Sequence, residues 1–228
     1  DGVFIYVPDD VKVEHPFQIV SLVNSRDNLL VQNRHVVRVG RNASLSLIQC
    51  DDSIQSGSNF LNVVTEISLS ENATLHYYKT ENKEADSILF HHLLVNQEAY
   101  SLFLSNAITF NAGYVGNHIR VNLNAPFAET RLYGLYLVDK QQHCDNQIKV
   151  SHNATDCKSF QLYKGILDDE AKAGFHGHVV VQPDAQRTNA YQTNRNILLT
   201  DKAVVNTKPF LEIYADDVQC SHGATVGQ

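Results

Sequence analysis

The sequence predicts an all-β protein, and within that class a β-solenoid built from stacked coils. Three observations support this prediction. Short runs alternate apolar and polar residues with period two, which is typical of half-buried strands. Glycine, asparagine and proline separate these runs as turn residues do. A six-residue motif recurs 30 residues along the chain, and a repeat of that length indicates a solenoid or an array.

Alternation is clear in segments such as Leu45-Ser46-Leu47, where the two leucines would face one side of a strand. No long amphipathic helix is evident, and only 168–173 is compatible with one short helical turn, which Gly174 would end. The candidate strands are 36–39, 44–48, 63–69, 74–78, 88–95, 119–123, 130–138, 178–181 and 211–214.

The repeat pairs Arg41-Asn42-Ala43-Ser44-Leu45-Ser46 with Glu71-Asn72-Ala73-Thr74-Leu75-His76, and 201–205 is a weaker relative. Asparagine suits a turn because it tolerates the left-handed conformation, and the small alanine would let the next coil approach closely. Stacked coils of a β-helix therefore explain the repeat well. The alternative is a β-sandwich whose turns resemble one another by chance.

Composition sets further limits. The chain has 228 residues, of which 43% are hydrophobic, and its net charge of −7 argues against nucleic acid as a partner. No apolar run approaches the ~20 residues that a membrane-spanning helix needs. No linker divides the chain, so we expect one domain over 1–228, as a fragment of a longer protein. The four cysteines form no CxxC motif and fit a reducing, cytoplasmic location.

Two histidine pairs are candidate metal ligands. His91 and His92 are neighbours in an apolar run, so they would face opposite sides of a strand and form a core-and-surface pair. His176 and His178 would share one face, but no third ligand is evident nearby. A structural role is favoured for both pairs.

Other chemical groups have weaker patterns. The cysteines and histidines at 143–157 match no standard zinc spacing. The acidic pairs do not by themselves supply the two separated carboxylates of a glycosidase, so turn and solvent roles are favoured. No nucleotide-binding loop or nucleophile elbow is present. The residues concerned are His143, Cys144, His152 and Cys157, and Asp51-Asp52, Asp168-Asp169 and Asp216-Asp217.

Cys220-Ser221-His222 is the strongest constellation. Residues that are two positions apart on a strand share a face, so the Cys220 thiolate and the His222 imidazole could bind one soft metal ion. Two ligands are an incomplete site, and a partner protein could supply the rest. Spacing alone still favours structural roles.

The last third of the chain resembles the SufB/SufD family of iron–sulfur cluster assembly proteins. The resemblance is long and nearly continuous over 134–228, whereas 1–133 fits the family only as generic β-coils. Gly223 follows His222 where SufB carries a glutamate, so the chain is more similar to the SufD branch. The stretches that carry the resemblance are 159–167, 175–177, 183–196 and 208–227.

This resemblance implies a right-handed parallel β-helix core whose flanking helical regions are absent here. It implies a non-catalytic scaffold subunit that pairs with SufB and the ATPase SufC, and a homodimer when SufB is absent. Neither nucleic acid nor a membrane is expected as a partner, and no cofactor is expected in the isolated chain. In the complex, His222 and Cys220 are expected to be ligands of nascent cluster or iron at the SufB interface.

Two alternatives remain open at this point. A SufB-like protein would accept sulfur on Cys220 or Cys157, although Gly223 argues against it. A β-helix polysaccharide lyase or hydrolase would carry acids and a basic catalytic residue along one face.

Overall fold

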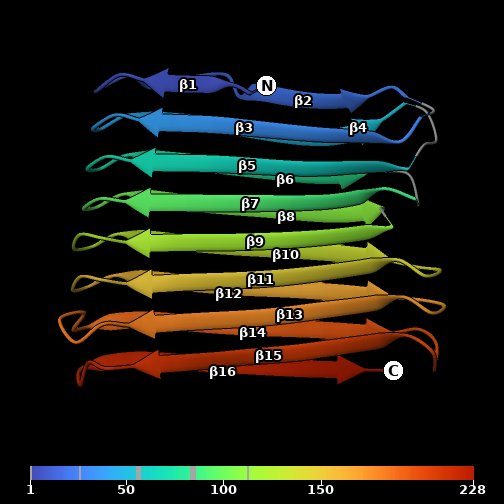
Figure 1. Ribbon diagram of the computed structural model, residues 1–228. Coiled ribbons are helices and arrows are strands. Elements are labelled where there is room, and N and C mark those ends of the chain that lie inside the picture. The colour runs from blue at the N-terminus through green and yellow to red at the C-terminus, as the bar shows by residue number, and fades with distance from the viewer. Residues whose placement is uncertain (1, 26, 55–57, 83–85, 112) are drawn as a thin grey trace.

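Two parallel β-sheets face one another along the whole molecule (Figure 1). The computed structural model describes residues 2–25, 27–54, 58–82, 86–111 and 113–228. Sheet A contains β1 (Phe4–Val7), β3 (Leu29–Val39), β5 (Asn59–Leu69), β7 (Ile88–Gln97), β9 (Tyr114–Leu123), β11 (His143–His152), β13 (Lys172–Val181) and β15 (Val204–Ile213). Sheet B contains β2 (Phe17–Val23), β4 (Ser44–Ser53), β6 (Thr74–Asn82), β8 (Leu102–Asn111), β10 (Glu129–Val138), β12 (Lys158–Leu167), β14 (Thr188–Leu198) and β16 (Val218–Gly227).

The chain alternates between the sheets, so each strand pairs in parallel with the strand two positions along the chain. One strand of each sheet forms one coil, and the coils wind in the right-handed sense (Figure 1). The prediction of an all-β parallel solenoid is confirmed, and the described residues contain no helix. The sandwich alternative is wrong, because the repeating unit stacks in register instead of folding back antiparallel.

The repeated motif stacks as the sequence predicted. Ser44 lies beside Thr74 and Leu45 beside Leu75 in the pairing of β4 with β6. Asn42 and Asn72 both adopt positive φ, at 56°, and the Asn72 Nδ2 donates to the Asn42 Oδ1 at 2.9 Å. The asparagine therefore makes the turn and also bonds the next coil.

The weaker relative of the motif at 201–205 also forms a turn that leads into a strand, with Ala203 buried, but it lies between β14 and β15, at the opposite end of the strands from the asparagine turns. One sequence prediction was wrong in detail. Residues 168–173 form no helical turn: Asp169 has positive φ in a tight turn, and β13 begins at Lys172. A turn serves this position because the chain must reverse direction within four residues to start the next strand.

The core fills the space between the two sheets, where every second side chain points inward. Leu45, Leu47, Leu75 and Tyr77 are buried there at 2% exposure or less. Inward glycines mark positions where a large side chain of the next coil takes the space. A Cβ on Gly165 would overlap the Tyr136 ring.

Candidate functional site

The last strand, β16, is the outermost strand of sheet B, and it carries Cys220 and His222. β16 pairs with β14 in register, so Cys220 lies over Ala190 and His222 over Gln192. Ala190 and Gln192 are buried and point between the sheets. Cys220 and His222 therefore point to the same inner side of the final coil, as the sequence predicted. The described residues place no further coil over them.

The two residues differ in how far the end of the solenoid covers them. Cys220 is half-buried and packs on a small cluster that includes Val179 and Ala190. Burial raises the pKa of its thiol. His222 is exposed, because nothing described stacks on its outer side. The end therefore offers an accessible imidazole beside a partly shielded thiol.

A buried amide ladder forms the floor beneath His222. The Gln192 Nε2 donates to the Gln161 Oε1 at 3.0 Å. The Gln192 Oε1 is buried and has no hydrogen-bond partner among the described residues. Gly177 on the facing sheet leaves room for this amide, because a Cβ there would overlap the Gln192 side chain. These stacked glutamine side chains therefore place buried polar groups directly beneath His222.

The motif stretch 183–196 places a second polar group under the same coil. Asn194 donates to the Tyr136 hydroxyl at 3.1 Å and to the Tyr163 carbonyl at 3.2 Å. Asn196 bonds both Tyr136 and Asn194. These asparagines lie under Ala224 and Val226 of β16. Asn194 and Asn196, in the stretch that carries the family resemblance, are therefore buried structural residues. The exposed His222 lies on the next coil.

The other histidine pairs behave as the sequence predicted. His91 is buried and His92 lies on the outer face of β7. His176 and His178 share the outer face of β13, where the His178 Nε2 lies 3.3 Å from the Glu212 Oε1. No group of three or more potential metal ligands converges within the described part of the chain.

The residues at 143–157 do not converge on one site. His143 lies on the outer face against Tyr114, with ring centroids 4.9 Å apart, whereas the neighbouring Cys144 is buried. The buried His152 shares a hydrogen bond with the Ser159 hydroxyl at 2.8 Å, and burial lowers its pKa to about 4. Structural roles explain these residues.

Cys157 lies directly before β12, at the end of the turn that follows β11. It is fully buried, and its thiol donates to the Ala125 carbonyl at 3.3 Å. Burial raises its pKa to about 11. A thiol that is buried and protonated is a poor acceptor of sulfur.

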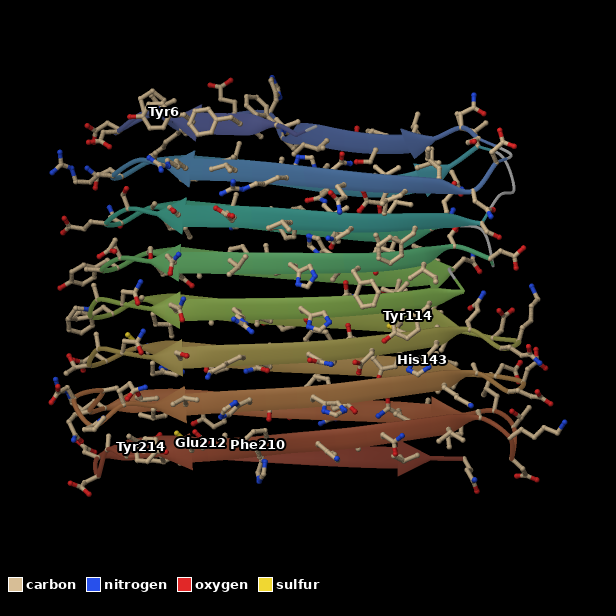
Figure 2. The ribbon with its side chains drawn as sticks, in the orientation of Figure 1. Tyr6, Tyr114, His143, Phe210, Glu212 and Tyr214 are labelled. Atoms are coloured by element: carbon tan, nitrogen blue, oxygen red, sulfur yellow. The ribbon has the colours of Figure 1, made fainter. Side chains whose placement is uncertain are left out.

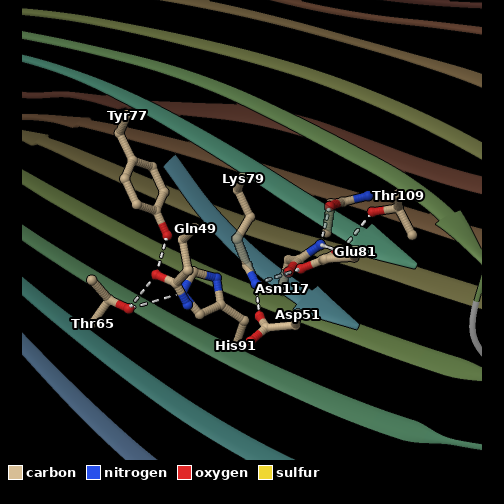
Figure 3. A network of polar contacts seen from close by, with 10 residues as sticks. Gln49, Asp51, Thr65, Tyr77, Lys79, Glu81, His91, Thr109 and Asn117 are labelled. Carbon is tan, nitrogen blue, oxygen red and sulfur yellow. Dashed lines mark hydrogen bonds and ion pairs between the residues drawn. The ribbon is translucent and has the colours of Figure 1, made fainter. Parts of the chain in front are cut away.

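Sequence reasoning missed a charged cluster inside the solenoid (Figure 3). Lys79 forms a buried ion pair with Asp51, and its Nζ also lies 3.9 Å from the Glu81 Oε1. All three side chains are at most 2% exposed. The assignment of Asp51 to a turn or solvent role was therefore wrong. Alternation could have revealed it, because Asp51 has the same parity as the inward Leu45 and Leu47.

Hydrogen bonds extend this cluster through several coils. Tyr77 donates to the Gln49 Oε1 at 2.7 Å, and Thr109 donates to the Glu81 Oε2 at 2.7 Å. Burial and the Lys79 charge hold the pKa of His91 well below its usual range, so this imidazole is neutral. Because its three charged side chains are at most 2% exposed, this is an internal polar cluster and not an accessible site.

Together, these features define a class of protein: a parallel β-solenoid whose last described coil carries a cysteine and a histidine on one side. Comparison with known proteins then identifies the family. The family described as "SUF system FeS cluster assembly, SufBD core domain" matches residues 21–228. The chain belongs to this family, and the match extends well beyond 134–228.

Three relatives show the extent of the similarity. An iron–sulfur cluster assembly SufBD family protein of Synechocystis is 31% identical over all of this chain and 52% of its own length. The SufD protein of Escherichia coli is 32% identical over 86% of this chain and 46% of its own length. Protein ABCI7, chloroplastic, of Arabidopsis thaliana is 32% identical over 99% of this chain and 49% of its own length. The chain thus spans about half the length of these relatives.

The chain belongs to an iron–sulfur cluster assembly family, and its similarity to a SufD protein agrees with the branch that the sequence predicted. No helix among the described residues is long and apolar enough to span a membrane.

Proposed function

We propose that this chain is the core of a SufD-type scaffold subunit, without enzymatic activity of its own, in a SUF assembly complex. Its partners are SufB and the ATPase SufC, and it forms a homodimer when SufB is absent. The observation that carries the proposal is the pair Cys220 and His222 on one side of the last described coil, in a chain of this family. A reducing, cytoplasmic setting fits four free cysteines.

The terminal coil has the properties of a docking edge. β15 and β16 are the last described strands of their sheets, and such strands carry backbone groups that another strand can bond. Exposed apolar side chains lie along the same coil, among them Tyr214 and Val226. Pairing with a second subunit would cover both the strand edges and these side chains. That subunit would also complete the ligand set that Cys220 and His222 begin.

The nascent cluster is cargo in this proposal, not a resident cofactor. Iron accepts thiolate and imidazole ligands, and ligands divided between two subunits can separate when the subunits move. The His222 imidazole is accessible for this role. Cys220 must lose its proton first, because burial raises its pKa, so its contribution depends on the partner.

Co-purification tests the proposal. The complete protein would be co-expressed with its SufB and SufC, as wild type, His222→Ala and the control His15→Ala, which removes an exposed histidine between β1 and β2. We expect all three to assemble, and only His222→Ala to lose most of the anaerobic cluster reconstitution. Failure of the wild type to bind either partner would reject the scaffold role. Full reconstitution by His222→Ala would reject the ligand role.

The sulfur-acceptor alternative receives no support from Cys157, which is buried with a raised pKa. Membership of the SufBD family likewise argues against a polysaccharide-active enzyme.

A further inference from the structure

The outer face of sheet A carries a basic region that extends from β7 to β15 (Figure 2 looks onto this face). In-register pairing aligns outward side chains of β7, β9, β11, β13 and β15 into columns across the strands. Two adjacent columns contain no carboxylate. They are His92, His118, Gln147, His176 and Lys208, and Leu94, Arg120, Lys149, His178 and Phe210. We call these ten residues the basic face.

The charge of the basic face is opposite to that of the chain. The chain has a net charge of −7, whereas the basic face carries three permanent cations and four imidazoles. The acids that border these columns already have contacts. Glu66, which lies beside Leu94 on β5, forms an ion pair with Arg34. Glu212 lies 3.3 Å from His178, and Asp145 accepts a hydrogen bond from Gln147 at 2.8 Å. Clustered cations in an acidic protein concentrate an anion at that place.

The face is hollowed where these side chains meet. A hollow of about 220 Å³ lies among seven residues of the basic face. Arg120, Gln147 and Lys149 line it together with His118, His176, His178 and Phe210. Ligand pockets for drug-sized molecules measure about 300–1,000 Å³. The hollow is therefore smaller than a pocket for a drug-sized molecule, and it is large enough for a small oxyanion.

The donors in the hollow match an oxyanion chemically. The Arg120 guanidinium offers a planar fork of N–H donors, and Lys149 offers a point charge. The Gln147 amide offers one further N–H group, because its other N–H donates to Asp145. His92, at the edge of the hollow, has its pKa lowered by burial and by the neighbouring His118 and Arg120. The hollow thus combines two permanent cations, Arg120 and Lys149, with neutral N–H donors.

We propose that the basic face binds a small multivalent oxyanion, with phosphate as the ligand class, either free or as the phosphoryl group of a larger molecule. Arg120 and Lys149 neutralise its charge, and His118 and His176 donate hydrogen bonds from either side. Phe210, which is 44% exposed and stacked on His178 at 4.1 Å, borders the hollow and would contact the rest of a larger ligand. This site is separate from Cys220 and His222 and does not depend on the proposed scaffold role.

The chain supplies a matched control for the test. Arg120 and Lys149 are exposed neighbours on adjacent strands of sheet A. Lys164 and Arg195 are exposed neighbours on adjacent strands of sheet B, beside apolar Ile166 and Ile197 instead of histidines. The double variants Arg120→Gln/Lys149→Gln and Lys164→Gln/Arg195→Gln therefore remove the same charge from the same kind of position.

The complete protein would be titrated with inorganic phosphate by calorimetry at low, constant ionic strength. We expect wild type and the sheet B variant to bind alike, and the sheet A variant to bind at least about tenfold more weakly. Adenosine monophosphate and adenosine form the second arm. Tighter binding of the monophosphate than of phosphate, with no binding of adenosine, identifies a phosphoryl group of a larger molecule, and equal binding identifies the free oxyanion. Absence of phosphate binding, or equal losses in the two double variants, would overturn the proposal.

Discussion

The interior charge cluster and the terminal coil occupy the same kind of position in the solenoid. Asp51, Lys79 and Glu81 point between the sheets, as do Cys220 and His222. The first group is sealed by coils on both sides and is at most 2% exposed. The second lies on the last described coil, where His222 is exposed. The difference lies in the covering coil, and not in the direction of the side chain.

This comparison separates two uses of polar residues in one repeat. Inside, a charge must be neutralised by the chain itself, because desolvation is expensive, and Lys79 does this for two carboxylates. At the end, an inward polar side chain can remain without a partner because water or another subunit can reach it. The interior is therefore closed to exchange, whereas the side chain of His222 on the last described coil is accessible.

Removing the central cation should have the largest effect on the sealed group. Lys79→Met leaves the Asp51 and Glu81 carboxylates buried without their ion pair, so we expect the free energy of unfolding to fall by about 3–5 kcal/mol. Urea denaturation measures this. Adding Asp51→Asn and Glu81→Gln removes the buried charges and should restore much of the loss. A Lys79→Met protein as stable as wild type would show that the cluster is not sealed.

Glycine substitutions compare steric closure in the two regions. A Cβ on Gly165 would overlap the Tyr136 ring and the Asn196 amide, so Gly165→Ala should lower the free energy of unfolding by about 3 kcal/mol, the upper end for overpacking. A Cβ on Gly223, in the edge strand β16, would have no other atom within 4 Å, so Gly223→Ala should change that free energy by no more than about 0.5 kcal/mol. Equal thermal shifts in the two variants would contradict the difference in closure.

Acid should act on the interior through its buried imidazoles. Burial lowers the pKa of His152 to about 4, from about 6.5 in an unfolded chain. Between these values the unfolded state binds a proton that the folded state does not, so stability falls as the pH falls. We expect a loss of about 2 kcal/mol from this group between pH 7 and pH 5. The urea midpoint should fall less between pH 7 and pH 5 in His152→Gln than in the wild type. An equal fall in both proteins would contradict the lowered pKa of His152.

The sequence predicted the repeat well because its signals are local. Asn42 and Asn72 mark turns, and the alternation of Leu45 and Leu47 identifies the inner face. The interior cluster was missed because adjacent acids such as Asp51-Asp52 resemble a turn, although alternation places only one of them inside. Extending the 30-residue repeat from Leu45 and Leu75 would have placed Asp51 beside Glu81, which is their observed register. Two stacked carboxylates then require a cation.

The sequence predicted the shared face of Cys220 and His222, but not what lies beneath them, and their role as ligands stays a prediction. Strand parity indicated that Cys220 and His222 point the same way. Only the register shows that they cover the buried Ala190 and Gln192, because cross-strand pairing is not encoded in a three-residue motif. The basic face depends on the same information, since His118 and His176 are far apart in sequence and align only through Gln147.

The smallest effect should appear at His222 itself. Its side chain is exposed, so His222→Ala should change the free energy of unfolding by no more than about 0.5 kcal/mol. Gln192, directly beneath it, is buried and bonded to Gln161, so Gln192→Ala should lower it by about 1–3 kcal/mol. Thermal denaturation of both variants gives the comparison. If His222→Ala were as destabilising as Gln192→Ala, the terminal coil would be part of the sealed interior, and loss of cluster assembly in that variant would report on folding instead of on a ligand.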